Sequence, residues 1–158
     1  MSASTYESNQ NRKVLAVSSG GGHWDELIAL RGAFDEADVV FATTIPELLQ
    51  KYSITGGYCL PDCNRNDVWM SVRCFFSAFS LVFRSRADVV ISTGAAPGLF
   101  CLLAARIMGK KTIWIDSIAN AEELSMSGKL AGFVATTWLT QWQHLARPSG
   151  PHFAGAVL

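Results

Sequence analysis

The chain has 158 residues, which is enough for one domain with a buried core but short for a two-lobed enzyme. Its 13 basic and 13 acidic residues cancel, so no net field attracts nucleic acid and we expect no nucleic-acid partner. Hydrophobic residues make up 49% and charged residues 16% of the chain, whereas soluble domains carry about 25% charged residues. The surplus apolar surface predicts a sheet buried on both faces, a partner subunit or a membrane surface.

Residues 1–12 are polar and lack the apolar core of a secretory signal peptide. We expect a disordered lead-in there, followed by a single domain over residues 13–158. No apolar run reaches the ~18 residues that a membrane-spanning helix needs.

The four cysteines form no paired CxxC motif. Cys74 and Cys101 fall within apolar runs, where a free thiol is an ordinary small hydrophobic group. Cys59 and Cys63 could pair or bind a metal, but no histidine or second cysteine pair completes a site. We therefore expect no metal and a reduced, cytoplasmic environment.

The first part of the chain alternates between strand and helix patterns. Residues 13–18 (KVLAVS) form a short apolar run that ends in a glycine cluster, which predicts a buried strand. Residues 24–34 place apolar side chains near helical spacing, with two acidic residues in the first turn, where the helix dipole favours them. A second strand is predicted over residues 38–43, a helix opened by proline over residues 46–52, and a short third strand over residues 57–60.

The middle of the chain is dominated by an unusually apolar helix. It is predicted over residues 68–83, after a polar loop at residues 62–67. Residues 88–92 (DVVIS) predict the next strand, and a second turn of small residues follows at 93–97. A helix is predicted over residues 98–108, before a glycine that suits its C-cap.

The last part of the chain continues the alternation. A strand is predicted over residues 111–116, a helix over 121–130, a strand over 133–137, a helix over 140–146 and a short strand over 153–157. Strands that alternate with helices, and that are nearly continuous in β-branched residues, favour a parallel sheet covered on both faces. The predicted fold class is α/β, with a Rossmann-like parallel sheet and helices on both faces.

The turn after the first strand is the main candidate ligand site. It contains Ser19, Gly20, Gly21, Gly22 and His23. Glycines let backbone N–H groups converge, and a following helix N-terminus adds positive potential, so the turn suits phosphate. The alternative is a tight strand-to-helix connection with the histidine as a cap; the histidine after three glycines favours ligand binding. An imidazole ordinarily titrates at about pH 6.5, so His23 is also the best candidate base.

Two common nucleotide-binding motifs are missing. The dinucleotide fingerprint needs a third glycine and an acidic residue closing the second strand. Here the second strand ends in Thr43 and Thr44, which disfavours NAD. A P-loop needs Gly-Lys-Ser/Thr, which is also missing, so ATP hydrolysis is not expected.

Two further strand ends carry candidate site residues. Because ligands bind beyond the carboxyl ends of parallel strands, Thr93, Gly94 and Ala95 would let a ligand approach the backbone at the start of the next helix. A plain connection explains these residues equally well. Asp116, followed by Ser117, could act as a base or bind a sugar hydroxyl, but a helix-capping role is favoured from these residues alone.

The apolar helix over residues 68–83 has two interpretations of similar weight. It could be buried against the sheet, as an all-round apolar helix usually is. Its narrow arginine-bearing stripe also suits the headgroup boundary of a membrane, with Trp69, Arg73, Phe76 and Arg84 as the predicted contacts.

Four motifs taken together resemble a known family. They are KVLAVSSGGGHWDELIAL, DVVISTGAAPGLFCLLAARIMGKKTIWIDS, LSMSGK, and the closing stretch from TQW to FAGAVL. In this order they resemble PssD-type bacterial polysaccharide proteins, which are similar to the acceptor subunit of the eukaryotic dolichol-linked GlcNAc transferase. The resemblance extends over nearly the whole chain from Lys13 onward.

The resemblance implies the N-terminal lobe of an inverting, metal-independent GT-B glycosyltransferase that makes polysaccharide. A second, PssE-like chain would supply the donor lobe and bind the sugar nucleotide, so no other cofactor is expected. The acceptor would be a polyprenyl-diphosphate-linked saccharide at the cytoplasmic face of the inner membrane. The predicted catalytic residues are His23 and Asp116. The predicted diphosphate-binding residues are Ser19, Gly20, Gly21, Gly22, Thr93, Gly94 and Ala95.

Three departures from the family pattern carry expectations of their own. Eukaryotic relatives have an N-terminal membrane helix that this chain lacks, so we expect attachment to be peripheral or through a partner. Asp116 stands where many relatives have Glu, which shortens its reach by one methylene. Trp24 is bulkier than the usual residue and is expected to narrow the acceptor site. The alternative functions are a non-catalytic adaptor that recruits a complete transferase to the membrane, and a free-standing nucleotide-binding protein.

Overall fold

The computed structural model describes residues 11–63 and 67–157, so most of the predicted lead-in and part of the 62–67 loop lie outside the described residues. Seven strands form one sheet in the order β3-β2-β1-β4-β5-β6-β7, and every neighbouring pair is parallel. The strands are Lys13–Val17 (β1), Asp38–Thr43 (β2), Tyr58–Cys59 (β3), Val89–Ser92 (β4), Lys111–Ile115 (β5), Thr137–Thr140 (β6) and His152–Phe153 (β7). The predicted parallel Rossmann-like sheet is confirmed.

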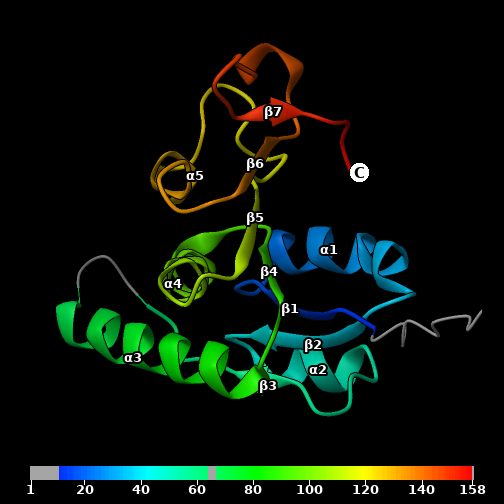
Figure 1. Ribbon diagram of the computed structural model, residues 1–158, viewed down its shortest axis with the longest axis vertical. Coiled ribbons are helices and arrows are strands. Elements are labelled where there is room, and N and C mark those ends of the chain that lie inside the picture. Colours follow the sequence, from blue (N-terminus) through cyan, green and yellow to red (C-terminus); the bar gives the residue numbers. More distant parts are fainter. Residues whose placement is uncertain (1–10, 64–66, 158) are drawn as a thin grey trace, which may run out of the picture.

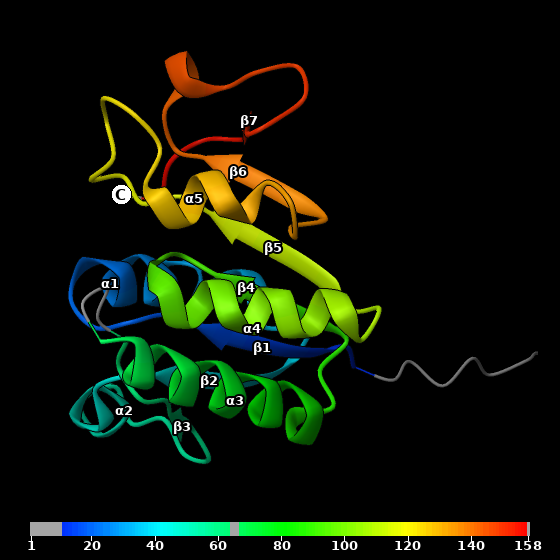
Figure 2. The same cartoon turned by 90° about the vertical axis from the view of Figure 1, so that its left-hand side faces the viewer.

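Helices cover both faces of the sheet, as predicted. The helices are Gly22–Ala29 (α1), Pro46–Lys51 (α2), Val68–Ser85 (α3), Ala95–Ile107 (α4) and Met126–Ala131 (α5), with short 3-10 turns at Arg31–Phe34 and Gln143–Leu145. Figure 1 shows α3, α4 and α5 on one side of the sheet and α1 and α2 on the other. Figure 2, turned by a quarter, shows α3, α4 and α5 as one layer of roughly parallel helices.

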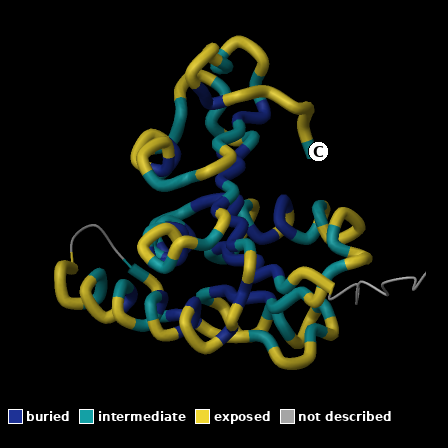
Figure 3. The backbone as a smooth tube through the Cα atoms, in the orientation of Figure 1, coloured by how far each residue is buried: buried dark blue, intermediate teal, exposed yellow. Residues whose placement is uncertain are grey.

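The core has two halves because successive strand residues point to opposite faces. In β1, Leu15 and Val17 pack with α3, α4 and α5. On the other face, Val14 and Ala16 pack with α1, α2 and the 3-10 turn Arg31–Phe34. Burying each of the larger of these apolar side chains contributes about 1.5–3 kcal/mol to the free energy of unfolding. Figure 3 shows this buried centre running through the sheet between exposed helix surfaces.

Trp24 belongs to the core and does not narrow a ligand site. Its side chain is fully buried on the α1 side of the sheet. Its ring makes edge contacts with Phe41 and Tyr52, with ring centroids 6.1 Å apart in both pairs. The expectation that its bulk narrows the acceptor site is therefore wrong.

The predicted boundaries fail most in the last third of the chain. The helix expected over residues 121–130 is limited to Met126–Ala131, and the strand expected over 133–137 lies at Thr137–Thr140. The helix expected over 140–146 is a single 3-10 turn at Gln143–Leu145. Side chains that bind the backbone of the loops between these elements compete with helix formation there.

Helix α4 begins earlier than predicted. It starts at Ala95, where a start at residue 98 was expected. Pro97 lies within its first turn, where a missing backbone N–H costs no hydrogen bond. Gly109 follows its end with a positive φ of 71°, which fits the predicted glycine stop. The shift brings the N-terminus of α4 onto the second predicted ligand turn.

Candidate functional site

The three glycines of the first turn differ in what they do. A side chain at Gly20 would collide with the end of the partly exposed Ile45 side chain, so a larger residue there needs Ile45 to move. Gly21 has a φ of 68°, which favours glycine for conformational reasons. Gly22 has an ordinary backbone and open space where a side chain would lie. Only Gly22 has no structural reason to be a glycine, so its bare backbone favours the ligand-binding interpretation.

His23 joins the two candidate ligand turns, the first at residues 19–23 and the second at residues 93–95. The Thr93 hydroxyl donates a 2.6 Å hydrogen bond to the His23 carbonyl oxygen. The ring of His23 lies against Gly94, where any side chain would collide with it. The buried Nδ1 atom of His23 has no hydrogen-bond partner among the described residues. The predicted catalytic histidine therefore lies between the two predicted phosphate turns.

The second turn carries backbone strain at Ala95. This residue has a φ of 66°, in the left-handed region that an L side chain rarely adopts. The Ser92 hydroxyl holds the turn by accepting a 3.2 Å hydrogen bond from the Gly94 amide. Strained residues of this kind cluster at ligand sites, where the surrounding structure maintains them.

Two helix N-termini therefore face the same edge of the sheet. Helix α1 begins at Gly22 and α4 at Ala95, beyond the adjacent parallel strands β1 and β4. Neither helix has a side-chain cap on its first backbone amides. Free amides and two helix dipoles at one place favour an anion with several oxygens, such as a diphosphate. Ser19 is half-buried beside the first turn, and its hydroxyl donates to the Gly20 carbonyl at 3.4 Å.

Asp116 is a buried carboxylate that accepts several hydrogen bonds. It is only 1% exposed. Its oxygens accept hydrogen bonds from the Ser125 hydroxyl and amide at 2.6 and 3.0 Å, from Trp114 Nε1 at 3.2 Å and from Asn120 Nδ2 at 3.3 Å. Gly128 lies so close that a side chain there would collide with the carboxylate. With its acceptor positions occupied, Asp116 anchors the loop before α5, and its catalytic role stays a prediction that a substitution has to test.

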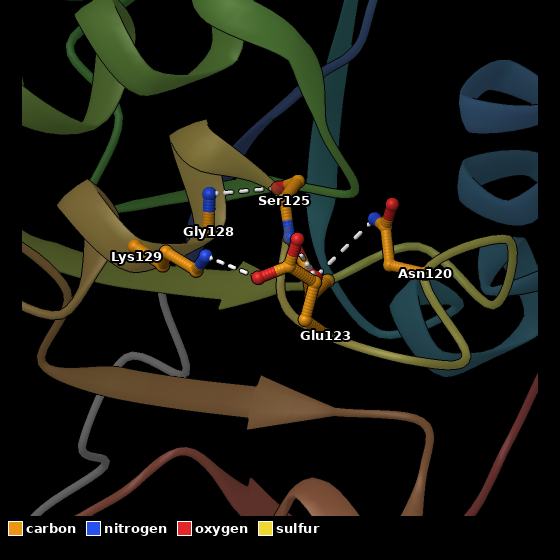
Figure 4. Close-up of polar contacts among 6 residues, drawn as sticks. Asn120, Glu123, Ser125, Gly128 and Lys129 are labelled. Carbon is orange, nitrogen blue, oxygen red and sulfur yellow. Dashed lines mark hydrogen bonds and ion pairs between the residues drawn. The ribbon is translucent and has the colours of Figure 1, made fainter.

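Figure 4 shows how this cluster begins helix α5. Ser125 is the N-cap, and its hydroxyl accepts a 2.8 Å hydrogen bond from the Gly128 amide. Asn120 points toward the carboxylate of Asp116, while Lys129 forms an exposed ion pair with Glu123. The helix-capping role favoured for Asp116 is therefore wrong, because Ser125 caps α5 and Asp116 binds the hydroxyl and amide of Ser125.

Sequence reasoning missed a second buried carboxylate near the site. Glu26 on α1 was interpreted only as an acidic residue in a first helical turn. It is buried, and it accepts hydrogen bonds from the Ser117 hydroxyl and from Gln141 Nε2, both at 2.6 Å. The only local signal is its position three residues after His23, on the same face of the helix.

The predicted membrane contacts lie on the outer face of α3. Trp69 is 79% and Phe76 67% exposed, and both arginines of the stripe, Arg73 and Arg84, are exposed as well. The opposite face of α3 packs on the sheet and on α4 through Cys74, Ala78, Leu81 and Val82. The buried interpretation holds for the packed face, whereas membrane contact by the exposed face stays a prediction.

A large open cavity lies away from these turns. It has a volume of about 850 Å³ and is lined by Val14, Val89, Ile91 and Ile113 among others. These residues lie toward the amino ends or middle of their strands. The cavity therefore does not coincide with the predicted site at the carboxyl ends.

Neither a metal cluster nor a membrane-spanning helix occurs in residues 11–63 and 67–157. All four cysteines are free thiols. Burial raises the pKa of the Cys74 and Cys101 thiols far above the usual range. These two cysteines are therefore unreactive core groups, as expected from their apolar surroundings.

Comparison with known proteins relates the chain to a named transferase subunit. The human UDP-N-acetylglucosamine transferase subunit ALG14 is 23% identical over 171 residues, which cover 86% of this chain and 78% of the human protein. The mouse protein of the same name is 27% identical over 169 residues, with the same coverage. The resemblance to the eukaryotic transferase subunit is confirmed, whereas the PssD-type assignment stays a prediction.

Solved structures share the fold. MurG from Acinetobacter baumannii superposes with a TM-score of 0.75 at 16% identity, over 93% of this chain and 46% of that chain. A UDP-N-acetylglucosamine 2-epimerase from Rickettsia bellii gives a TM-score of 0.71 at 15% identity, over 93% of this chain and 45% of that chain. The chain thus spans just under half the length of these proteins.

The family assignment rests on more than half of the sequence. The model of the family described as "Oligosaccharide biosynthesis protein Alg14 like" matches residues 62–157. The matched region includes the second ligand turn, the Asp116 cluster and the closing strands. The chain therefore belongs to the family of Alg14-like oligosaccharide biosynthesis proteins.

Proposed function

We propose that this chain is the acceptor-binding subunit of a two-chain glycosyltransferase. The complex would transfer a sugar from a sugar nucleotide to a polyprenyl-diphosphate-linked saccharide in polysaccharide biosynthesis. The observation that carries this proposal is the contact between the two ligand turns, which places His23 between the uncapped starts of α1 and α4. Family membership and the name of the mammalian relatives support a transferase subunit.

The acceptor diphosphate would bind to the backbone amides of the two turns. Ser19 and the glycines at 20–22 would contribute from the first turn, and Thr93, Gly94 and Ala95 from the second. The acceptor hydroxyl would attack the anomeric carbon of the donor as the bond to the nucleoside diphosphate breaks, with inversion. His23 would accept the hydroxyl proton, or would instead hold the diphosphate. This scheme uses no metal.

A second chain would supply the donor lobe. The solved relatives of this fold are about twice as long as this chain, which matches just under half of each. The mammalian relatives are named as subunits. A PssE-like chain that binds the sugar nucleotide would complete the enzyme, and UDP-N-acetylglucosamine, named in those relatives, is the first donor to test.

The complex would act at the cytoplasmic face of the inner membrane, with this chain attached peripherally. The helix layer on one side of the sheet has the charge such a role needs. Helices α3 and α4 contain Arg73, Arg84 and Arg106 and no carboxylate, while Lys129 of α5 is paired with Glu123. Cationic and apolar groups on one face suit an anionic headgroup layer. The contacts proposed on α3 are Trp69, Arg73, Phe76 and Arg84.

Reconstitution tests the proposal directly. The purified chain, a candidate donor-binding chain and both together are incubated with a sugar nucleotide and a polyprenyl-diphosphate saccharide, and transfer is followed by mass change of the lipid. We expect transfer only from the mixture, because the proposal assigns the acceptor site to this chain and the donor site to the other. Transfer by this chain alone would contradict the two-chain proposal.

A His23→Ala variant of the complex separates the proposal from the adaptor alternative. We expect partner binding to persist and transfer to fall by about 10²-fold or more, as loss of a proton-transferring group causes. Full activity with intact partner binding would favour a non-catalytic, membrane-recruiting adaptor. Tight binding of a sugar nucleotide by this chain alone would favour a free-standing nucleotide-binding protein.

A further inference from the structure

Glu26 is a buried carboxylate whose partners are all uncharged. It is 2% exposed and lies on α1, one helical turn after the glycine turn. Its oxygens accept from the Ser117 hydroxyl at 2.6 Å, from Gln141 Nε2 at 2.6 Å and from the Ile118 amide at 3.4 Å. The two ion pairs formed by the described residues both lie elsewhere, on the surface. A carboxylate is costly to bury unless its lone pairs are satisfied, so these contacts depend on one another.

The contacts of Glu26 continue into a network that joins separate parts of the chain. Gln141 also donates to the Asp116 carbonyl at 3.1 Å, and its Oε1 accepts from the Val157 amide at 2.9 Å. Nearby, Trp142 Nε1 donates to the Ile118 carbonyl at 2.8 Å. The carboxylate thereby ties α1 to the ends of β5 and β6 and to the segment that follows β7.

Glu26 and His23 are three residues apart, which places them on the same face of α1. His23 is anchored at its carbonyl by Thr93, beyond the end of β4. Glu26 is anchored beyond β5 and β6. One turn of the helix is therefore held against three neighbouring strand ends. This double attachment sets the tilt of α1, and with it the direction of the glycine amides and of the imidazole.

We propose that Glu26 is a positioning residue for sugar transfer. Its hydrogen bonds hold the first turn of α1 so that the glycine amides and His23 meet the acceptor together. The proposal rests on the proposed function. A displacement of about 1 Å at a reacting group can cost about 10²-fold in rate, so a residue that only orients α1 has a measurable effect on acceptor use.

A Glu26→Gln substitution tests this role without changing side-chain size. The amide group replaces one acceptor oxygen by a donor, so the Ser117 hydroxyl has to turn from donor to acceptor or one hydrogen bond is lost. The matched control is Asp25→Asn, which removes the neighbouring exposed acid that accepts a 3.2 Å hydrogen bond from the Tyr52 hydroxyl. Both variants are compared with the unmodified two-chain complex.

The readout is kcat and KM for acceptor and donor separately, per folded molecule. For Glu26→Gln we expect acceptor kcat/KM to fall about 10-fold or more while donor KM stays within about twofold. For Asp25→Asn we expect both within about twofold of the unmodified complex. Equal kinetics in the two variants, or a Glu26→Gln loss explained entirely by its unfolded fraction, would overturn the proposal.

Amide hydrogen exchange gives a second readout for Glu26 that does not require sugar transfer. If the unmodified complex transfers no sugar, the proposed function fails, but exchange still reports on the position of α1. In Glu26→Gln we expect faster exchange at residues 20–23 and 117–119, with no change in Asp25→Asn. Unchanged exchange in both segments would overturn the positioning role.

Discussion

At the scale of single residues, Gly22 separates a structural glycine turn from a ligand-binding one. A methyl group at this position meets no atom within 4 Å, and the backbone is not in the left-handed region. An alanine there should fold normally and gain up to about 1 kcal/mol of stability, since glycine is costly in a helix. If a diphosphate packs on the bare backbone, the same methyl group obstructs it.

We therefore expect Gly22→Ala to raise the unfolding free energy by up to about 1 kcal/mol while raising the acceptor KM about 10-fold in the two-chain assay. Gly32→Ala is the control, because Gly32 also has open space and lies outside the site, in the turn Arg31–Phe34. Denaturant unfolding and steady-state kinetics measure the two effects. An unchanged acceptor KM in Gly22→Ala would favour the plain strand-to-helix connection.

For Asp116 we expect a substitution to change stability rather than activity. An asparagine there would present an amide to groups that already donate, Ser125 and Trp114 among them. Leaving such a buried polar group unsatisfied costs about 1–3 kcal/mol. We expect Asp116→Asn to lower the unfolding free energy by that amount, as measured by denaturant titration. Activity per folded molecule should change less than about threefold, whereas loss of a general base costs about 10²–10⁴-fold.

The individual residues show where local reasoning succeeds. His23 and the glycine turn were found from the sequence because a strand ending in a glycine cluster is a local pattern. Glu26 was not found, since its partners Ser117 and Gln141 are 91 and 115 positions away. Asp116 was assigned two roles from the sequence: the structure contradicts helix capping, and the catalytic role stays a prediction.

At the scale of elements, α3 makes the membrane proposal testable. Its outer face exposes Trp69 and Phe76, which can enter a headgroup layer without disturbing the packed face. Replacing both with serine should leave circular dichroism and thermal stability unchanged. Burying one such side chain contributes about 1.5–3 kcal/mol, so we expect binding to anionic vesicles to weaken at least about 10-fold.

Phe133→Ser is the control for the vesicle experiment. Phe133 is highly exposed but follows α5, so α4 separates it from α3 in the helix layer. We expect its substitution to leave vesicle co-sedimentation unchanged. Equal binding of the α3 variant and the unmodified chain would mean that α3 is not the membrane contact.

Elements also differ in how well they were predicted. Strands β1, β2, β4 and β5 match their predicted ranges within a residue, because each is an apolar run bounded by turn residues. The segment between β5 and β6 does not. There the side chains of Asp116 and Ser125 bind loop backbone and delay the helix to Met126.

At the scale of the whole molecule, the two faces of the sheet are chemically unlike. Helices α3 and α4 carry arginines and no carboxylate, whereas α1 and α2 contain Asp25, Glu26 and Glu47. The proposed membrane side and the anchored α1 therefore lie on opposite faces (Figure 1). The candidate acceptor turns lie at the carboxyl edge between them.

The α/β class, the parallel sheet, the glycine turn with His23 and the family resemblance could all be predicted from the sequence. These depend on local periodicity and on motifs in a fixed order. Three findings came from the folded chain alone: Trp24 is core, Asp116 anchors a loop, and Glu26 joins three strand ends. The reason is physical: a parallel sheet brings the carboxyl ends of distant strands to one edge. Hydrogen bonds between those ends leave no periodic trace in the sequence.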